Sequence, residues 1–183
     1  ALAFKRFRIA LFIVFYVGFS LAATQASPIS GRVPLDCSFS GSLQMRGFIF
    51  CALNRHYVVP ELKAAMEDVA EAVEAEHPGT ITQLLDASFP FLDGFPMLPH
   101  LSHDDGQKID LAFYYTRNGA YDAGGTPSPI GFFAFEDGPT DCPKSWLTLR
   151  WDLAWLQPFW PDMEFDIERT ATLVEALADD PRI

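Results

Sequence analysis

The sequence predicts an α+β fold in which flanking helices cover a small antiparallel sheet. Residues 60–77 carry apolar side chains at helical spacing, whereas residues 108–115 alternate as a strand does. Helical and strand-like segments mix along the chain without a regular strand–helix–strand alternation, which argues against a parallel sheet. With 183 residues, 49% of them hydrophobic, the chain suits one domain and a short appendage.

The first element is an apolar segment at the amino terminus. Lys5, Arg6 and Arg8 precede residues 9–23, which are apolar apart from one glycine and one serine. This pattern is typical of a secretory signal peptide, and an uncleaved membrane anchor is the alternative. We expect residues 1–26 to be one or the other. The remainder would be exported, either periplasmic or anchored to the cytoplasmic membrane facing the periplasm, and would contact the membrane only through this segment.

The next elements are a linker and a helix. Residues 27–36 are rich in Ser, Pro and Gly, so we expect a linker before a domain over 27–183. Pro60 suits the first position of a helix over 60–77, and Met66 and Val69 lie in its apolar stripe.

Several strands and a closing helix follow this helix. We expect strands at 80–87, 108–115, 130–135 and 146–151. In the second of them Ile109, Leu111 and Phe113 share one face. A helix over 166–178 would turn Ile167, Thr170, Val174 and Leu177 to one side.

Charge and cysteine content exclude two classes of protein. The 24 acidic residues outnumber 13 basic ones, so the chain would repel nucleic acid. Cys37, Cys51 and Cys142 lack the C-x-x-C spacing of zinc fingers. Export permits a disulfide between Cys37 and Cys51, although a buried free cysteine is also possible.

Residues 99–111 hold the densest group of chemically active side chains. Gly106 allows a turn that brings the His103 ring and the Asp110 carboxylate toward one point, and both are zinc-ligand types. The alternative is a hydrogen-bonded His–Asp pair that fixes the turn. Possible supporting residues, which would orient the ligands, are His100, Asp104, Asp105 and Asp152.

The pattern Ser102-His103-x-x-Gly106-x-x-x-Asp110 resembles the first half of the motif of the LAS group of zinc peptidases. This group includes the D-alanyl-D-alanine metallopeptidases, the penicillin-insensitive murein endopeptidases and the lysostaphin-type enzymes. The resemblance implies a LAS/hedgehog-like fold with Zn²⁺ bound by His103 and Asp110. It also implies a third ligand and a catalytic histidine from a later His-x-His segment.

No histidine follows His103, so we expect that His-x-His segment beyond Ile183, with the domain incomplete at its C-terminus. The catalytic residues are therefore unknown from this chain. The resemblance implies an exported zinc metallopeptidase, of murein endopeptidase or D,D-carboxypeptidase type, that hydrolyses peptide bonds of peptidoglycan. This chain would then be an incomplete and inactive fragment. The alternative is a non-catalytic periplasmic binding or structural domain with a degenerate metal site.

Overall fold

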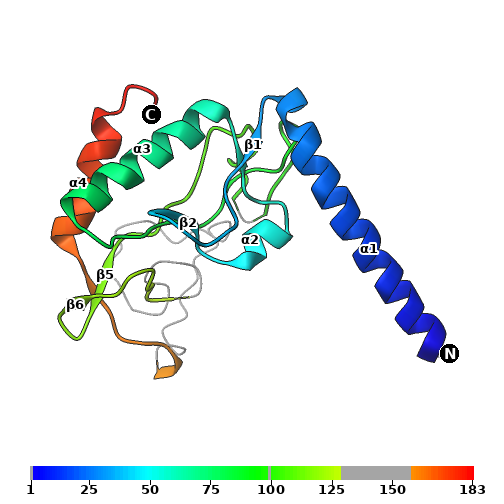
Figure 1. The fold of residues 1–183 in the computed structure, drawn as a ribbon, viewed down its shortest axis with the longest axis horizontal. Helices are drawn as coiled ribbons and strands as arrows, with labels where there is room; N and C mark the ends of the chain where they lie inside the picture. The colour runs from blue at the N-terminus through cyan, green and yellow to red at the C-terminus, as the bar shows by residue number, and fades with distance from the viewer. Residues whose placement is uncertain (1, 99, 129–157) are drawn as a thin grey trace, which may run out of the picture.

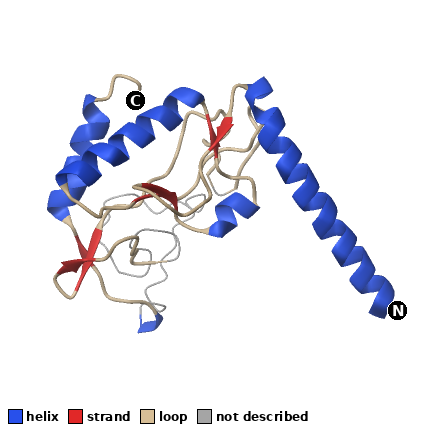
Figure 2. Ribbon diagram, in the orientation of Figure 1, coloured by secondary structure: helices blue, strands red, loops and turns tan. Residues whose placement is uncertain are grey.

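The computed structural model describes residues 2–98, 100–128 and 158–183. It has mixed α and β structure, with a long amino-terminal helix that projects from a body of short strands and helices (Figures 1 and 2). This confirms the mixed α and β class. The strands expected at 130–135 and 146–151, together with Cys142 and Asp152, lie outside the described residues.

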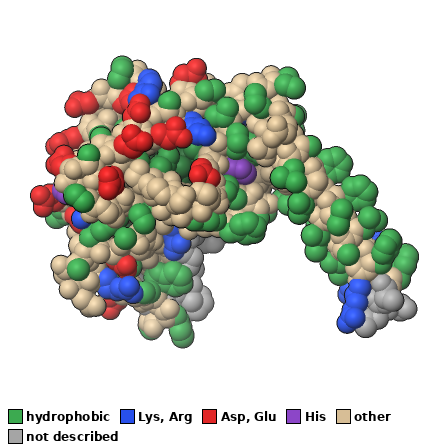
Figure 3. Space-filling view, viewed as in Figure 1, with side chains coloured by type: hydrophobic (Ala, Val, Ile, Leu, Met, Phe, Trp, Pro, Cys, Tyr) green, Lys and Arg blue, Asp and Glu red, His purple; other side chains and the backbone are tan. Residues whose placement is uncertain are grey.

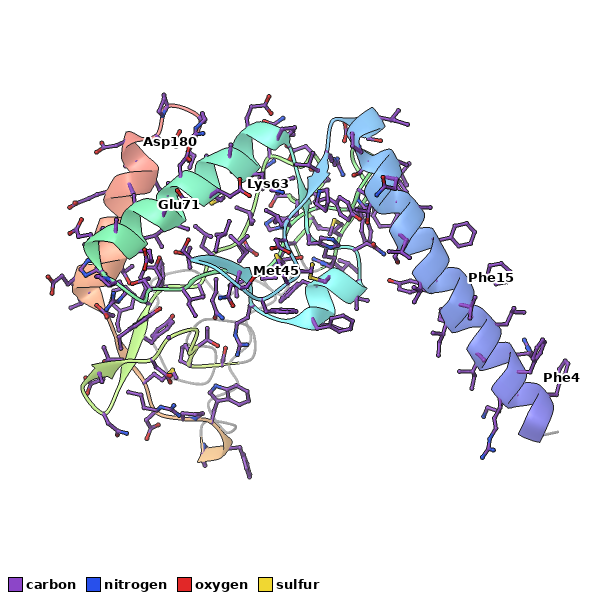
Figure 4. The ribbon with its side chains drawn as sticks, in the orientation of Figure 1. Phe4, Phe15, Met45, Lys63, Glu71 and Asp180 are labelled. Carbon is purple, nitrogen blue, oxygen red and sulfur yellow. A yellow bond between two sulfur atoms is a disulfide. The ribbon has the colours of Figure 1, made fainter. Side chains whose placement is uncertain are left out.

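Helix α1 (Leu2–Ala26) is apolar and largely exposed, and it is long enough to cross a membrane. Phe4 and Phe15 point away from the body (Figure 4), and basic side chains lie at the free end (Figure 3). Such a helix could be a signal peptide or a membrane anchor. Its second half contacts the body, where the Tyr16 hydroxyl bonds a backbone carbonyl and Asn54 donates to Ser20 Oγ at 3.0 Å.

The segment after α1 belongs to the body, so the prediction of a linker over 27–36 is wrong. It forms the short 3₁₀ helix η1 (Ser27–Ser30) and strand β1 (Val33–Pro34), which pairs antiparallel with β3 (Tyr57–Val58). Arg32 is 1% exposed and donates to the backbone carbonyl oxygens of Phe89 and Asp104 at 2.6 and 2.8 Å. The glycine and serine residues of this segment form turns within the body and do not mark a linker.

The strands form three small sheets among the described residues. Strand β2 (Leu43–Met45) pairs with β4 (Thr82–Leu84) in parallel, which corrects the expectation of one antiparallel sheet. The antiparallel three-stranded sheet has the order β6–β5–β7, formed by Ala120–Tyr121, Tyr115–Arg117 and Glu164–Phe165.

The helices of the body enclose the core. Helix α3 (Pro60–Glu76) confirms the strongest helical prediction and buries Met66 and Val69. It packs beside α4 (Ile167–Asp179), while the short α2 (Phe48–Ala52) lies on the side near α1 (Figure 1). Acidic side chains gather over α3 and α4 on the face shown in Figure 3.

The strand expected over 108–115 is mostly absent. One isolated antiparallel bridge joins Leu111 to Leu84, and only at Tyr115 does strand β5 begin. Ala112 and Tyr114 are buried and Phe113 is 46% exposed, so the side chains alternate over 112–114. Ile109 and Leu111 pack against the core and Phe113 does not, so the face expected for these three residues is only partly formed. The chain here is extended, but its pairing with residues 83–86 is too short to form a regular ladder.

Candidate metal centre

Four side chains converge on one point beside strand β4. They are Asp86, His100, His103 and Asp110, and one ligand atom from each lies within 4.8 Å of those from the others. We call this group the Asp–His cluster. It is a partly buried set of imidazole nitrogens and carboxylate oxygens that could bind a metal ion.

Backbone pairing places the two carboxylates of the cluster side by side. The Asp110 amide donates to the Asp86 carbonyl oxygen at 2.9 Å, and the Leu85 amide donates to the Asp110 carbonyl oxygen at 2.8 Å. These two bonds align the chain after β4 with the extended segment that carries Asp110. The Asp110 side chain therefore emerges next to that of Asp86.

A buried serine holds the turn that carries His103. The Ser88 hydroxyl donates to the His103 carbonyl oxygen at 2.7 Å and accepts from the Gly106 amide at 3.0 Å. Gly106 has a φ of +79°, a conformation that side-chain-bearing residues rarely adopt. The turn thus folds back as its glycine predicts, and it brings His103 to Asp110.

The distances within the cluster are short. His100 Nδ1 lies 2.7 Å from Asp86 Oδ2 and 2.9 Å from Asp110 Oδ2. His103 Nε2 lies 3.2 Å from Asp110 Oδ1, and His103 Nδ1 is buried without a hydrogen-bond partner among the described residues. The side chains of Asp86 and His103 are 3% and 6% exposed, whereas those of Asp110 and His100 are 36% and 38% exposed. The cluster therefore opens to solvent on the Asp110 and His100 side.

Arg55 holds the buried carboxylate of the cluster. Its Nε donates to Asp86 Oδ1 at 2.6 Å, its Nη2 contacts Asp86 Oδ2, and its Nη1 donates to the Leu98 carbonyl oxygen at 2.8 Å. A planar guanidinium matches a carboxylate in this two-point geometry. Arg55 therefore fixes Asp86 and, through residue 98, the approach of the chain to His100.

The charges around Asp110 favour its ionised form. Burial by itself would raise the pKa of the Asp110 carboxyl. The hydrogen bond and charge of His103, with the charges of His100 and Arg55, outweigh that effect and lower the pKa below its ordinary value. Two neighbouring carboxylates in a partly buried site need positive charge nearby, which Arg55 supplies and a metal ion or a protonated histidine would complete.

The structure brings together some of the expected site residues and not others. His103 and Asp110 meet, and His100 contacts both carboxylates directly. Asp104 and Asp105 lie outside the cluster, and Asp105 instead pairs with Lys108 at 2.6 Å.

Sequence reasoning missed Asp86 and Arg55. The available signal was one carboxylate inside the otherwise apolar segment Leu84-Leu85-Asp86-Ala87.

A second group of candidate ligands lies away from this motif. Cys37 and Cys51 form a disulfide with Cα atoms 6.2 Å apart, and His56 lies beside it. His56 is 7% exposed, and burial lowers its pKa to about 4 despite an opposing backbone hydrogen bond.

Comparison of the chain with protein-family models, curated proteins and solved structures yields no match.

Proposed function

We propose that the chain is the zinc-binding part of an exported metallopeptidase of the LAS type, acting on the peptides of peptidoglycan. The observation that supports this proposal is the meeting of His103 and Asp110, which the motif pairs as ligands. Helix α1 is compatible with the export that a peptidoglycan substrate requires.

The donor set of the Asp–His cluster fits zinc. Zinc in catalytic sites is held by three protein ligands drawn from histidine and carboxylate and keeps one position open. The buried Nδ1 of His103 has no hydrogen-bond partner in the described part of the chain and lies 3.9 Å from Asp86 Oδ2, as expected of a site built for an additional partner. His103 and Asp110 would hold the ion, and in the motif the third ligand comes from a His-x-His segment.

Each residue has a separate part in this proposal. When bound, zinc would polarise a peptide carbonyl and lower the pKa of a water molecule. Arg55 holds Asp86 in place, and Asp86 orients the His100 ring by contacting Nδ1 of His100. The exposed side chains of His100 and Asp110 mark the side from which a peptide reaches the cluster.

The test measures zinc content and peptide release together. The oxidised protein, as this chain and as the complete gene product, is loaded with zinc, desalted and assayed by elemental analysis. We expect His103→Ala and Asp110→Ala each to lose the zinc, whereas His77→Ala, whose Nε2 contacts Thr172 instead, keeps it. The complete gene product should release soluble peptides from purified peptidoglycan. Unchanged zinc in both ligand variants would remove the proposal.

One observation favours a second candidate, a non-catalytic binding or structural domain. His100 Nδ1 already contacts both carboxylates, so the cluster can satisfy its charges without an ion. Under this alternative the oxidised protein binds no zinc, and adding zinc leaves its melting temperature unchanged. A zinc-dependent rise in melting temperature that His103→Ala abolishes would exclude it.

A further inference from the structure

A group of three potential ligands stands apart from the Asp–His cluster. Cys37 follows β1, Cys51 lies in α2, and His56 immediately precedes β3. One ligand atom from each lies within 4.8 Å of the other two. We call this group the Cys–His cluster. Both cysteines pack against the core, so a partner enclosed between them would be shielded from solvent.

His56 is held in place while one nitrogen of its ring lacks a hydrogen-bond partner among the described residues. Its carbonyl oxygen accepts from the Leu35 amide at 2.7 Å, and its ring lies against Tyr57 with centroids 4.4 Å apart. Nδ1 is buried and has no hydrogen-bond partner within the described part of the chain. A buried polar atom left unpaired loses the hydrogen bonds that it would make with water, so native structures rarely keep one without a reason. The disulfide offers this nitrogen no strong donor.

We propose that reduction of the Cys37–Cys51 disulfide turns the Cys–His cluster into a zinc site with two thiolates, one imidazole and one open position. Thiolate sulfur and imidazole nitrogen are the ligands that zinc selects in tetrahedral sites. The site differs from the proposed peptidase centre in place and in chemistry, because that centre offers only nitrogen and oxygen. It therefore goes beyond the proposed function and does not depend on it.

The chemistry balances with a dithiol as reductant. The dithiol gives two electrons and two protons to the disulfide, which yields the two cysteine thiols, and the dithiol itself becomes a disulfide. Zinc then displaces one proton from each thiol into solvent. With Zn–S distances of about 2.3 Å, the two sulfurs on a tetrahedral ion lie roughly 3.8 Å apart. Rotation about the Cα–Cβ bonds, across Cα atoms 6.2 Å apart, brings the sulfurs to that separation.

This assignment makes the disulfide and the metal ion mutually exclusive. In the oxidised chain the bond between the sulfurs removes both thiolates, and His56 alone cannot hold zinc. In the reduced chain the ion would replace the covalent link between α2 and the segment after β1. The same part of the fold is thus joined in either redox state.

Cobalt(II) serves as the probe, since it absorbs in the near ultraviolet only when thiolate sulfur binds it. The full chain carries Cys142→Ser, which leaves only the two cysteines of the cluster. We expect cobalt to produce the sulfur-to-metal band after reduction with a phosphine, no band in the oxidised chain, and loss of the band when zinc is added. The Asp–His cluster cannot produce this band, so the result is independent of the peptidase proposal.

Two experiments test the role of His56. One replaces His56, and the other identifies the ligand atoms of the bound metal in a chain that keeps His56. His56→Leu should weaken cobalt binding by at least about tenfold, whereas His77→Leu should leave the affinity unchanged. Cadmium-113 NMR of the reduced Cys142→Ser chain, with all four histidines intact, should report a site with two sulfur ligands and one nitrogen. Absence of the band after reduction would overturn the proposal. So would a cadmium shift that reports sulfur and oxygen only, even if His56→Leu fails to fold.

Discussion

Replacing Arg55 with leucine tests whether the Asp–His cluster depends on one buried ion pair. The side chains of Arg55 and Asp86 are 13% and 3% exposed, and they meet through two guanidinium nitrogens. Removing one partner of a buried pair leaves an uncompensated charge, at a cost of about 3–5 kcal/mol. We expect Arg55→Leu to lower the free energy of unfolding by about 4 kcal/mol. The measurement is urea denaturation of the full chain in mild detergent at about pH 8, where free histidine is neutral.

A double-mutant cycle separates the stranded charge from lost packing. Asp86→Asn removes the carboxylate, so Arg55→Leu combined with Asp86→Asn should cost at least about 1 kcal/mol less than the sum of the single variants. Arg117→Leu is the control, because the pair of Arg117 with Asp122 is more exposed, and its loss should cost at most about 1 kcal/mol. The reasoning fails if Arg55→Leu costs no more than this control, or if the two single costs add within about 0.5 kcal/mol.

Three further changes test other features of the fold. Gly106→Ala should destabilise the chain by about 1–3 kcal/mol in thermal melting. The φ of Gly106 is +79°, and the new Cβ would lie 3.1 Å from Nε of Arg32. An unchanged melting temperature would refute the argument. Replacing Cys37 and Cys51 with alanine opens a loop with a sequence separation of 14. The free energy of unfolding, measured with denaturant, should fall by about 3 kcal/mol, and a fall of less than about 1 kcal/mol would contradict this. His56 has a pKa near 4 in the fold and about 6.5 when unfolded, so the unfolded chain binds more protons between these values. Stability should therefore fall by about 3 kcal/mol from pH 6.5 to pH 4, and the same slope in His56→Leu would show that another group causes it.

Helix α3 can be predicted from sequence because its apolar side chains repeat at the helical period and the packing follows that period. Helix α4 can be predicted in position and only partly in orientation. Of the side chains expected on one side, Thr170 is buried and Leu177 packs against the core, whereas Ile167 and Val174 are 73% and 51% exposed. The Thr170 hydroxyl accepts the Tyr114 amide at 3.3 Å and Leu173 packs in one core cluster with Tyr114, so contacts between distant segments accompany the face that turns inward.

The candidate metal centre shows the same division between local and tertiary information. His103 and Asp110 are close because a glycine turn joins them, and a turn of this kind is visible in a short stretch of sequence. Asp86 and Arg55 come from distant segments, and they reach the cluster only through backbone pairing that no local pattern encodes. A single carboxylate in an apolar segment is the one trace that Asp86 leaves in the sequence.

The way α1 rests on the body limits how the helix can meet a bilayer. Among the described residues, the hydrogen bonds of α1 to the body begin at Tyr16, and the helix from residue 4 to residue 15 makes none. Twelve helical residues extend about 18 Å, whereas the hydrocarbon layer of a membrane is about 30 Å thick. If α1 enters a membrane along its full apolar length, it gives up its hydrogen bonds at Tyr16 and Ser20, so full insertion and docking on the body are competing states of one helix.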